Sequence, residues 1–341
     1  MDSIFLDTFN GIETSRPPVW FMRQAGRILP SYQKLKLQYT FSDLMKNKKL
    51  ASEVTLLPLD DLGVDAAILF SDILLIPESL GLNLEFTDKG PKFHNPISNI
   101  SNNEKFNFDS TKLNFVYDNI EEIKKNIPLN IPLIGFCGGP LTTFLFMFRG
   151  NEIDRSFHSA IKYFYSNKKD SLKIMDSITE ASIEYLNNQV NSGIDCFQLF
   201  ETYCGIIPSE LYIKDIMPYS KKILEKSKEL NQPTIFFPKN FNEGLKVVNK
   251  DLCDFVGIDA NVSLDFARKI VDNNVGLQGN MDPKTFYLSY DEIDDYLDSL
   301  INFGSKNQNW IFNLGRGFMP DIDHRKVKYV VDQIKTINWN R

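Results

Sequence analysis

The feature that most limits the possible folds is an alternation of short apolar runs with longer helical patterns. The runs are continuously apolar, which is typical of parallel strands buried on both faces. Eight such runs are predicted to be strands: Val19–Met22, Asp65–Phe70, Pro132–Phe136, Cys196–Phe200, Thr234–Phe237, Phe255–Asp259, Gly276–Asn280 and Trp310–Leu314.

Amphipathic patterns between these runs predict helices at Lys169–Val190, Asp215–Leu230, Phe241–Asn249, Ser263–Val271, Tyr290–Ile301 and Arg325–Ile334. Repeated strand-then-helix units predict an α/β fold, a single (β/α)8 TIM barrel, for which about 250 residues is typical. The chain has 341 residues, and most of the surplus lies in Pro77–Ile131, an insertion between strands 2 and 3. No linker, repeat or low-complexity block divides the chain, so we expect one domain over residues 1–341.

Composition excludes several classes of protein. Hydrophobic residues make up 43% and charged residues 24%, as in ordinary globular chains. A formal net charge of −6 without a basic stripe argues against a nucleic-acid partner. No apolar run reaches the ~18 residues of a membrane span, and the N-terminus lacks a signal-type stretch, which predicts a cytoplasmic protein with no membrane partner.

Cysteine and histidine usage argues against disulfide and metal chemistry. The four cysteines form no C-x-x-C pair, and the three histidines are scattered without metal-ligand spacing. These residues are Cys137, Cys196, Cys204 and Cys253, and His94, His158 and His324. We therefore expect no metal and no Ser/Cys–His nucleophile, and we assign Cys137 no role.

Arginine placement gives the strongest functional signal. Barrel active sites lie at the carboxyl ends of the strands. Only nine arginines occur against 29 lysines, yet Arg23 and Arg27 follow the first run and Arg316 follows the last. Because guanidinium groups bind carboxylates and phosphates in a bidentate manner, these positions predict an anion-binding barrel mouth.

The strand-end segments resemble those of the uroporphyrinogen decarboxylase family. Pro18–Arg27 (PVWFMRQAGR) resembles the family's first signature, P-x-W-x-M-R-Q-A-G-R, and Gly135–Thr142 (GFCGGPLT) resembles the second, G-F-x-G-x-P-x-T. Phe70–Leu74, Leu277–Pro283 and Asn313–Gly315 are similar to three further blocks. The matches occur in order and extend from about residue 17 to 335.

This resemblance implies a homodimer of (β/α)8 subunits that needs no cofactor. Members of the family convert the four acetate side chains of uroporphyrinogen III to methyl groups, giving coproporphyrinogen III and CO2 in porphyrin and heme biosynthesis. By resemblance, Asp72, Arg23 and Arg27 are the predicted catalytic residues, with Asp72 accepting the pyrrole N–H bonds. The predicted substrate-binding residues are Arg23, Gln24, Ala25, Gly26, Arg27, Asp72, Phe146, Thr202 and Arg316.

Two positions depart from the family pattern. Phe146 stands where the family has Tyr, and Arg316 stands where it has His. These departures leave open a non-catalytic paralogue that binds a tetrapyrrole or another carboxylate. A superfamily methyltransferase with a zinc site is disfavoured because Cys253 has no His-x-Cys partner, and a Schiff-base lyase using Lys239 is the third alternative.

Overall fold

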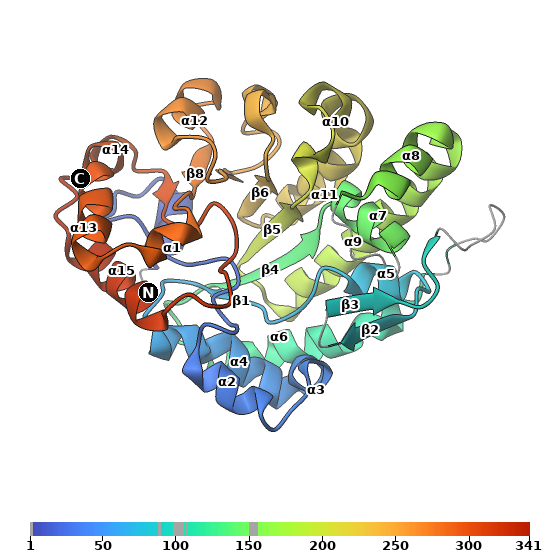
Figure 1. Cartoon of the computed structure of the whole chain (residues 1–341), viewed down its shortest axis with the longest axis horizontal. Coiled ribbons are helices and arrows are strands. Elements are labelled where there is room, and N and C mark those ends of the chain that lie inside the picture. The colour runs from blue at the N-terminus through green and yellow to red at the C-terminus, as the bar shows by residue number, and fades with distance from the viewer. Residues whose placement is uncertain (1–2, 88–89, 98–105, 107, 150–155) are drawn as a thin grey trace.

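The centre of the computed structural model is a curled parallel sheet with helices around it (Figure 1). The structure describes residues 3–87, 90–97, 106, 108–149 and 156–341. Seven strands pair in the order β1-β4-β5-β6-β7-β8-β9, and every pairing between them is parallel. They are β1 (Ala67–Ile68), β4 (Leu133–Gly138), β5 (Cys196–Glu201), β6 (Thr234–Pro238), β7 (Phe255–Gly257), β8 (Gly276–Gln278) and β9 (Trp310–Ile311).

Seven of the eight predicted runs thus contain a strand, whereas the first, Val19–Met22, forms only an isolated parallel bridge from Val19 to Phe312. In this first run, side chains accept the hydrogen bonds of backbone amides that would otherwise pair with a neighbouring strand. The Asp65 carboxylate accepts from the amide of Val19 at 2.8 Å, and Asn313 Oδ1 accepts from the amide of Met22 at 3.1 Å. The prediction of a regular first strand was therefore wrong for these residues, although the segment occupies the expected place.

Five of the six predicted helical patterns contain an α-helix, and the sixth does not. Residues 241–249 contain a 3-10 helix, η4 (Asn242–Val247), rather than an α-helix. The other helices after β4 are α7 (Pro140–Arg149), α8 (His158–Ser166), α9 (Lys168–Ser192), η3 (Cys204–Ile206), α10 (Ser209–Asp215), α11 (Met217–Glu229), α12 (Leu264–Ile270), η5 (Pro283–Tyr287), α13 (Tyr290–Ser299), α14 (Ile301–Lys306) and α15 (His324–Thr336). Gly193, with φ +107°, ends α9 in the left-handed conformation that favours glycine.

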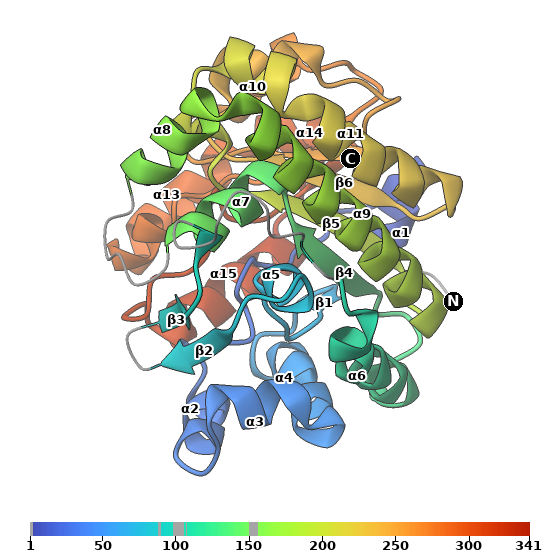
Figure 2. The same ribbon diagram turned by 90° about the vertical axis from the view of Figure 1, so that its right-hand side faces the viewer.

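The segments before β4 include an antiparallel hairpin that does not join the main sheet (Figure 2). The Phe86 ring of the hairpin packs 4.8 Å from Phe41, which in turn packs 5.4 Å from Phe70 beyond the end of β1. The hairpin is therefore held near a strand end. The elements here are α1 (Ile4–Phe9), α2 (Pro30–Lys36), α3 (Phe41–Lys46), α4 (Lys48–Asp61), α5 (Leu75–Ser79), β2 (Leu84–Thr87), β3 (Gly90–Phe93), η2 (Ser110–Leu113) and α6 (Asn114–Asn126).

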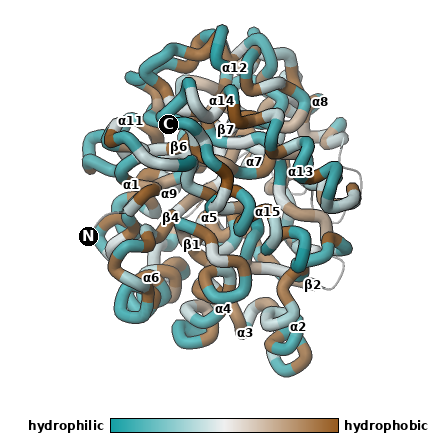
Figure 3. Tube along the Cα trace, turned by 90° about the vertical axis from the view of Figure 1, so that its left-hand side faces the viewer, coloured by the Kyte–Doolittle hydropathy of each residue, from teal (hydrophilic) through white to brown (hydrophobic). Residues whose placement is uncertain are grey.

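Hydrophobic side chains from the sheet and the inner helix faces form the core. Hydrophobic and hydrophilic residues alternate along helices such as α4 and α6, as burial of one helix face requires (Figure 3). Buried polar groups bond to one another: Trp20 Nε1 donates to Gln278 Oε1 at 3.0 Å, and Gln278 Nε2 donates to Gln198 Oε1 at 3.3 Å. Among the described helices, none has the length and apolar character needed to cross a membrane.

Candidate active site

A tight turn after the first run presents Arg23. The amide of Gln24 donates to the Phe21 carbonyl at 3.1 Å, and Arg23 takes a left-handed conformation with φ +64°. The Gln24 side chain is buried, with Oε1 accepting from the Phe21 amide at 3.0 Å and Nε2 donating to the Ala66 carbonyl at 2.9 Å. Gln24 therefore braces the turn with its side chain, while the Arg23 side chain is exposed.

The residues after this turn carry hydrogen-bond donors that the described part of the protein does not use. Ala25 and Gly26 are half-buried, and their amide N–H groups have no hydrogen-bond partner within the described residues. Arg27 is exposed and lies near Tyr32, where its charge partly offsets the rise in the Tyr32 pKa that burial causes. Two amides and an exposed guanidinium in sequence are suited to an anionic ligand.

Asp72 lies two residues after Phe70, the last residue of the second predicted run, on the segment that follows β1. Its Oδ1 accepts from the Leu74 amide at 2.8 Å. The side chain keeps some solvent exposure, yet the protein surrounds it closely enough that burial raises its pKa from 3.8 to about 6. The Leu74 bond and the charge of Arg23 oppose that rise. Asp72 is consequently a carboxylate above about pH 6 and accepts hydrogen bonds there.

Cations from other strand ends lie beside Arg23. A Cβ on Gly317 would lie 2.6 Å from Arg23 Cδ, so the arginine stem packs against that glycine, next to Arg316. Lys239, which follows β6, is half-buried. Burial lowers its pKa, the charges of Arg316 and Arg23 lower it further, and Asp259 opposes them. The structure therefore brings Arg23, Arg316 and Lys239 into one electropositive region.

These cations are not held in ion pairs by the part of the protein that the structure describes. Within the described ranges, Arg23, Arg27, Arg316 and Lys239 form no ion pair with a carboxylate. Arg16, in contrast, binds Asp65 through two hydrogen bonds of 2.6 and 2.9 Å. The strand-end cations are thus available to a ligand.

Thr202 directly follows β5, and Phe146 lies in α7, the helix that follows the neighbouring strand β4. Thr202 is half-buried, and its hydroxyl has no hydrogen-bond partner in the part of the chain that the structure describes. The Phe146 ring lies 5.8 Å from Tyr203 and 5.5 Å from Phe157, in edge-to-face geometry. No hydrogen bond or ion pair among the described residues joins this aromatic group to Arg23.

Sequence reasoning missed two buried carboxyl groups at strand ends. Glu201, the last residue of β5, is fully buried, and burial raises its pKa to about 7 although four donors face it. Asp259, after β7, accepts from the amides of Asn240 and Asn261, both at 2.8 Å. An acidic residue that closes an otherwise apolar strand was the available signal.

The cysteines offer no activated nucleophile. All four are buried, and burial raises the pKa of each thiol above its ordinary value. Among the described residues, no three His, Cys, Asp or Glu side chains gather closely enough to hold a metal ion.

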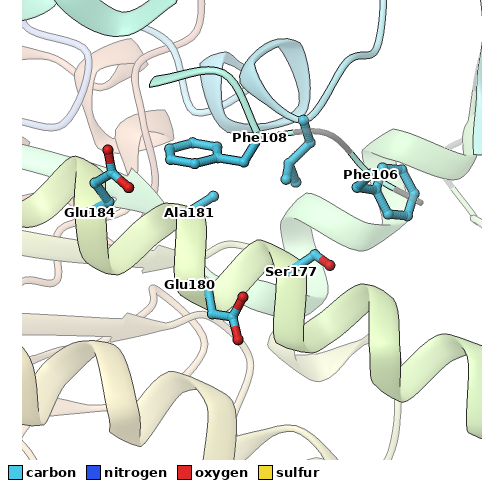
Figure 4. Close-up of a pocket in the computed structure, with 7 residues that line it drawn as sticks. Phe106, Phe108, Ser177, Glu180, Ala181 and Glu184 are labelled. Atoms are coloured by element: carbon cyan, nitrogen blue, oxygen red, sulfur yellow. The ribbon is translucent and has the colours of Figure 1, made fainter. Parts of the chain in front are cut away.

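A separate cavity of about 200 Å³ lies beside α9 (Figure 4). Glu180 and Glu184 of α9 line it together with Phe106 and Phe108. None of the predicted site residues contributes to its wall. The cavity is therefore not part of the candidate active site.

The α/β fold with its curled parallel sheet is shared with a solved structure. A methyltransferase from Methanosarcina mazei superposes with a TM-score of 0.77 over 98% of this chain and 99% of its own, at 14% sequence identity. A similarity at this identity concerns the fold alone. It gives no support to the methyltransferase alternative.

Sequence comparison then identifies the family. Residues 2–337 match the family model described as Uroporphyrinogen decarboxylase (URO-D). Uroporphyrinogen decarboxylases of Vesicomyosocius okutanii (38% identity, 95% of each chain) and Trichlorobacter lovleyi (35%, 99% of each) are similar over nearly their full length. The enzyme of that name from Helicobacter pylori is 37% identical over 97% of this chain and 98% of its own. This chain belongs to the uroporphyrinogen decarboxylase family, as its motifs predicted.

Proposed function

We propose that this protein is a carboxy-lyase that decarboxylates the four acetate side chains of uroporphyrinogen III without a cofactor and releases coproporphyrinogen III. The observation that carries the proposal is the family match over residues 2–337, combined with Asp72 and Arg23 lying within electrostatic range at strand ends. Relatives named uroporphyrinogen decarboxylase at 34–38% identity support the same activity.

In the proposed reaction the substrate provides its own electron sink. A pyrrole ring protonated at carbon is an iminium-like cation. When the bond between the acetate CH2 and its carboxyl carbon breaks, CO2 leaves and the electron pair moves into that cation. A proton then adds to the CH2 group and completes the methyl group, and the ring carbon releases the proton that it took up, which restores the neutral pyrrole. Asp72, ionised above about pH 6, accepts the pyrrole N–H bonds and stabilises the cation.

The unpaired cations fit the eight carboxylates of this substrate. Arg23, Arg27 and Arg316 each offer a planar fork of donors that can bind one carboxylate through two bonds. The amides of Ala25 and Gly26, which have no hydrogen-bond partner among the described residues, add donors beside Arg23. The turn braced by Gln24 keeps these groups in place.

The two departures from the family pattern are compatible with this role. Arg316 places a permanent positive charge where the family His could titrate, and it thereby adds a carboxylate clamp. Phe146 keeps an aromatic ring against Tyr203 but has no hydroxyl. In our proposal, the Thr202 hydroxyl supplies a hydrogen bond to the substrate on this side.

The proposal includes a closed (β/α)8 barrel in one domain, with residues 77–131 as the insertion after the second strand. The bridge from Val19 to Phe312, and a 2.8 Å bond from the Asp65 amide to the Val19 carbonyl, support the first run as the closing strand. Family membership supports a homodimer in the cytoplasm.

Anaerobic incubation with enzymatically generated uroporphyrinogen III tests the proposal. The products are oxidised and separated by chromatography. Porphyrins with seven to four carboxylates are the expected result. If none forms, fluorescence titration separates the alternatives: binding without turnover indicates a non-catalytic tetrapyrrole binder, and absence of binding indicates another carboxylate ligand.

A further inference from the structure

Glu201 is a buried carboxyl group that joins three elements at the edge of the candidate site. Its Oε2 accepts from the Leu141 amide and from the Tyr212 hydroxyl, both at 3.2 Å. Its Oε1 accepts from the amide of Thr142 at 2.7 Å and from the hydroxyl of Thr142 at 2.5 Å. Because Leu141 and Thr142 lie in the first turn of α7 and Tyr212 lies in α10, one carboxyl group connects β5 to both helices.

The Thr142 hydroxyl extends this connection to the loop after β5. Its oxygen accepts from the amide of Tyr203 at 3.1 Å while it donates to Glu201. Thr202 lies between these two anchored residues. The backbone on both sides of Thr202 is therefore fixed to the first turn of α7.

The next turn of α7 carries Phe146, whose ring forms an aromatic wall together with the ring of Tyr203. Phe146 lies one helical turn after Thr142, and its ring meets the Tyr203 ring at 5.8 Å with an interplanar angle of 74°. A shift of the Tyr203 backbone would thus change the spacing between Phe146 and the loop. Thr202 would move with it.

The local sequence makes room for this arrangement. A Cβ on Gly139 would lie 2.5 Å from the Glu201 carboxyl carbon, so only glycine fits beside the carboxyl group. When Glu201 is ionised, its charge at the start of α7 also interacts favourably with the helix dipole. Neither feature is needed for a buried side chain that only fills space.

We propose that Glu201 and Thr142 are positioning residues, which hold Thr202 and Tyr203 against α7 so that this wall of the substrate site is formed before substrate binds. The inference rests on the proposed function, because it assigns Thr202 and the aromatic wall to substrate binding. Glu201 itself is fully buried, so we assign it no contact with the substrate.

Matched substitutions at Thr142 test the inference. T142V keeps the β-branched shape and removes the hydroxyl that links Glu201 to Tyr203, whereas T142S keeps the hydroxyl and removes a methyl group. We expect T142V to weaken uroporphyrinogen III binding by about 10-fold, as loss of roughly one hydrogen bond predicts. T142S should stay within about twofold of wild type. Fluorescence titration measures both.

Amide hydrogen exchange provides a readout that does not depend on substrate. We expect the Tyr203 amide to exchange faster in T142V than in wild type and to be unchanged in T142S. The inference is overturned if Tyr203 exchange in T142V equals that of wild type, or if T142S loses as much affinity as T142V. If T142V does not fold, T142A compared with T142S again differs by the hydroxyl alone.

Failure of the proposed function is distinguishable from failure of this inference. If wild-type protein neither binds nor decarboxylates the tetrapyrrole, the proposed function fails. The exchange of the Tyr203 amide in the same variants still decides whether Thr142 positions the loop.

Discussion

Replacing Asp72 with Asn should nearly abolish turnover and at the same time stabilise the protein. The folded-state pKa of about 6 lies above the ordinary value of 3.8, so the fold disfavours the ionised form. One pKa unit is worth about 1.36 kcal/mol, so the ionised carboxylate costs about 3 kcal/mol at pH 8. The protein therefore has its full stability with respect to Asp72 below pH 3.8, where this carboxyl group is neutral in both the folded and the unfolded state. It loses about 3 kcal/mol of that stability as the pH rises through 6. Asn removes the charge, and its Oδ1 can still accept from Leu74.

Two measurements on D72N check this reasoning. Urea unfolding, followed by the fluorescence of the buried Trp20, Trp310 and Trp339, should give D72N about 3 kcal/mol more stability than wild type at pH 8. The gain should shrink to about 1 kcal/mol at pH 4.5, where Asp72 is mostly protonated in the folded protein. Anaerobic turnover of uroporphyrinogen III should be nearly lost.

A matched control is D60N, which removes an exposed carboxylate from α4. We expect it to leave both stability and turnover close to wild type. Retention of half the wild-type rate by D72N would refute the assigned role. If D72N were no more stable than wild type at pH 8, the electrostatic reasoning would be wrong even if activity were lost.

Four further perturbations give distinct outcomes. The kcat/KM of wild type should fall as the pH drops below about 6, because protonated Asp72 no longer stabilises a cation; a flat profile from pH 8 to 5 would contradict this. R23Q should raise KM by about 10- to 100-fold without loss of stability, since Arg23 forms no ion pair with any described residue. R16Q should instead lower the free energy of unfolding by about 3 kcal/mol and leave KM closer to wild type. F146Y should keep or raise turnover; a large drop would mean that the site has adapted to Phe146.

The strand order and the strand-end residues were predictable from sequence for a simple physical reason. Strands buried on both faces must be apolar throughout, so each appears as a continuous run. Parallel pairing then places the residues that follow each run at one edge of the sheet. Asp72, Arg23 and Arg316 were identified in this way, and the structure places Arg23 within electrostatic range of Asp72.

The first run was not predictable to the same degree, because its hydrogen bonds come from distant side chains. The partners of the Val19 and Met22 amides, Asp65 and Asn313, lie 46 and 291 positions away. A local pattern of apolar residues contains no information about such partners. It indicates a strand where the structure has a bridge.

Glu201 escaped prediction for a related reason. Its environment depends on Thr142, 59 positions earlier, and on Tyr212, 11 positions later. In the sequence it is one more acidic residue after an apolar run. Only the fold reveals that four donors surround it and that the Thr142 hydroxyl connects it to Tyr203.

Two arginines seven positions apart differ in how their charges are used within the described structure. Arg16 is paired with Asp65, whose carboxylate also binds the Val19 amide, so this charge holds the segment in place. Arg23 lies beside Arg316 and Lys239 without a carboxylate partner among the described residues. Like charges that share a region raise its electrostatic free energy, and a polyanion that binds there relieves this cost. Charges that repel one another in this way would therefore favour a ligand with many carboxylates over one with few.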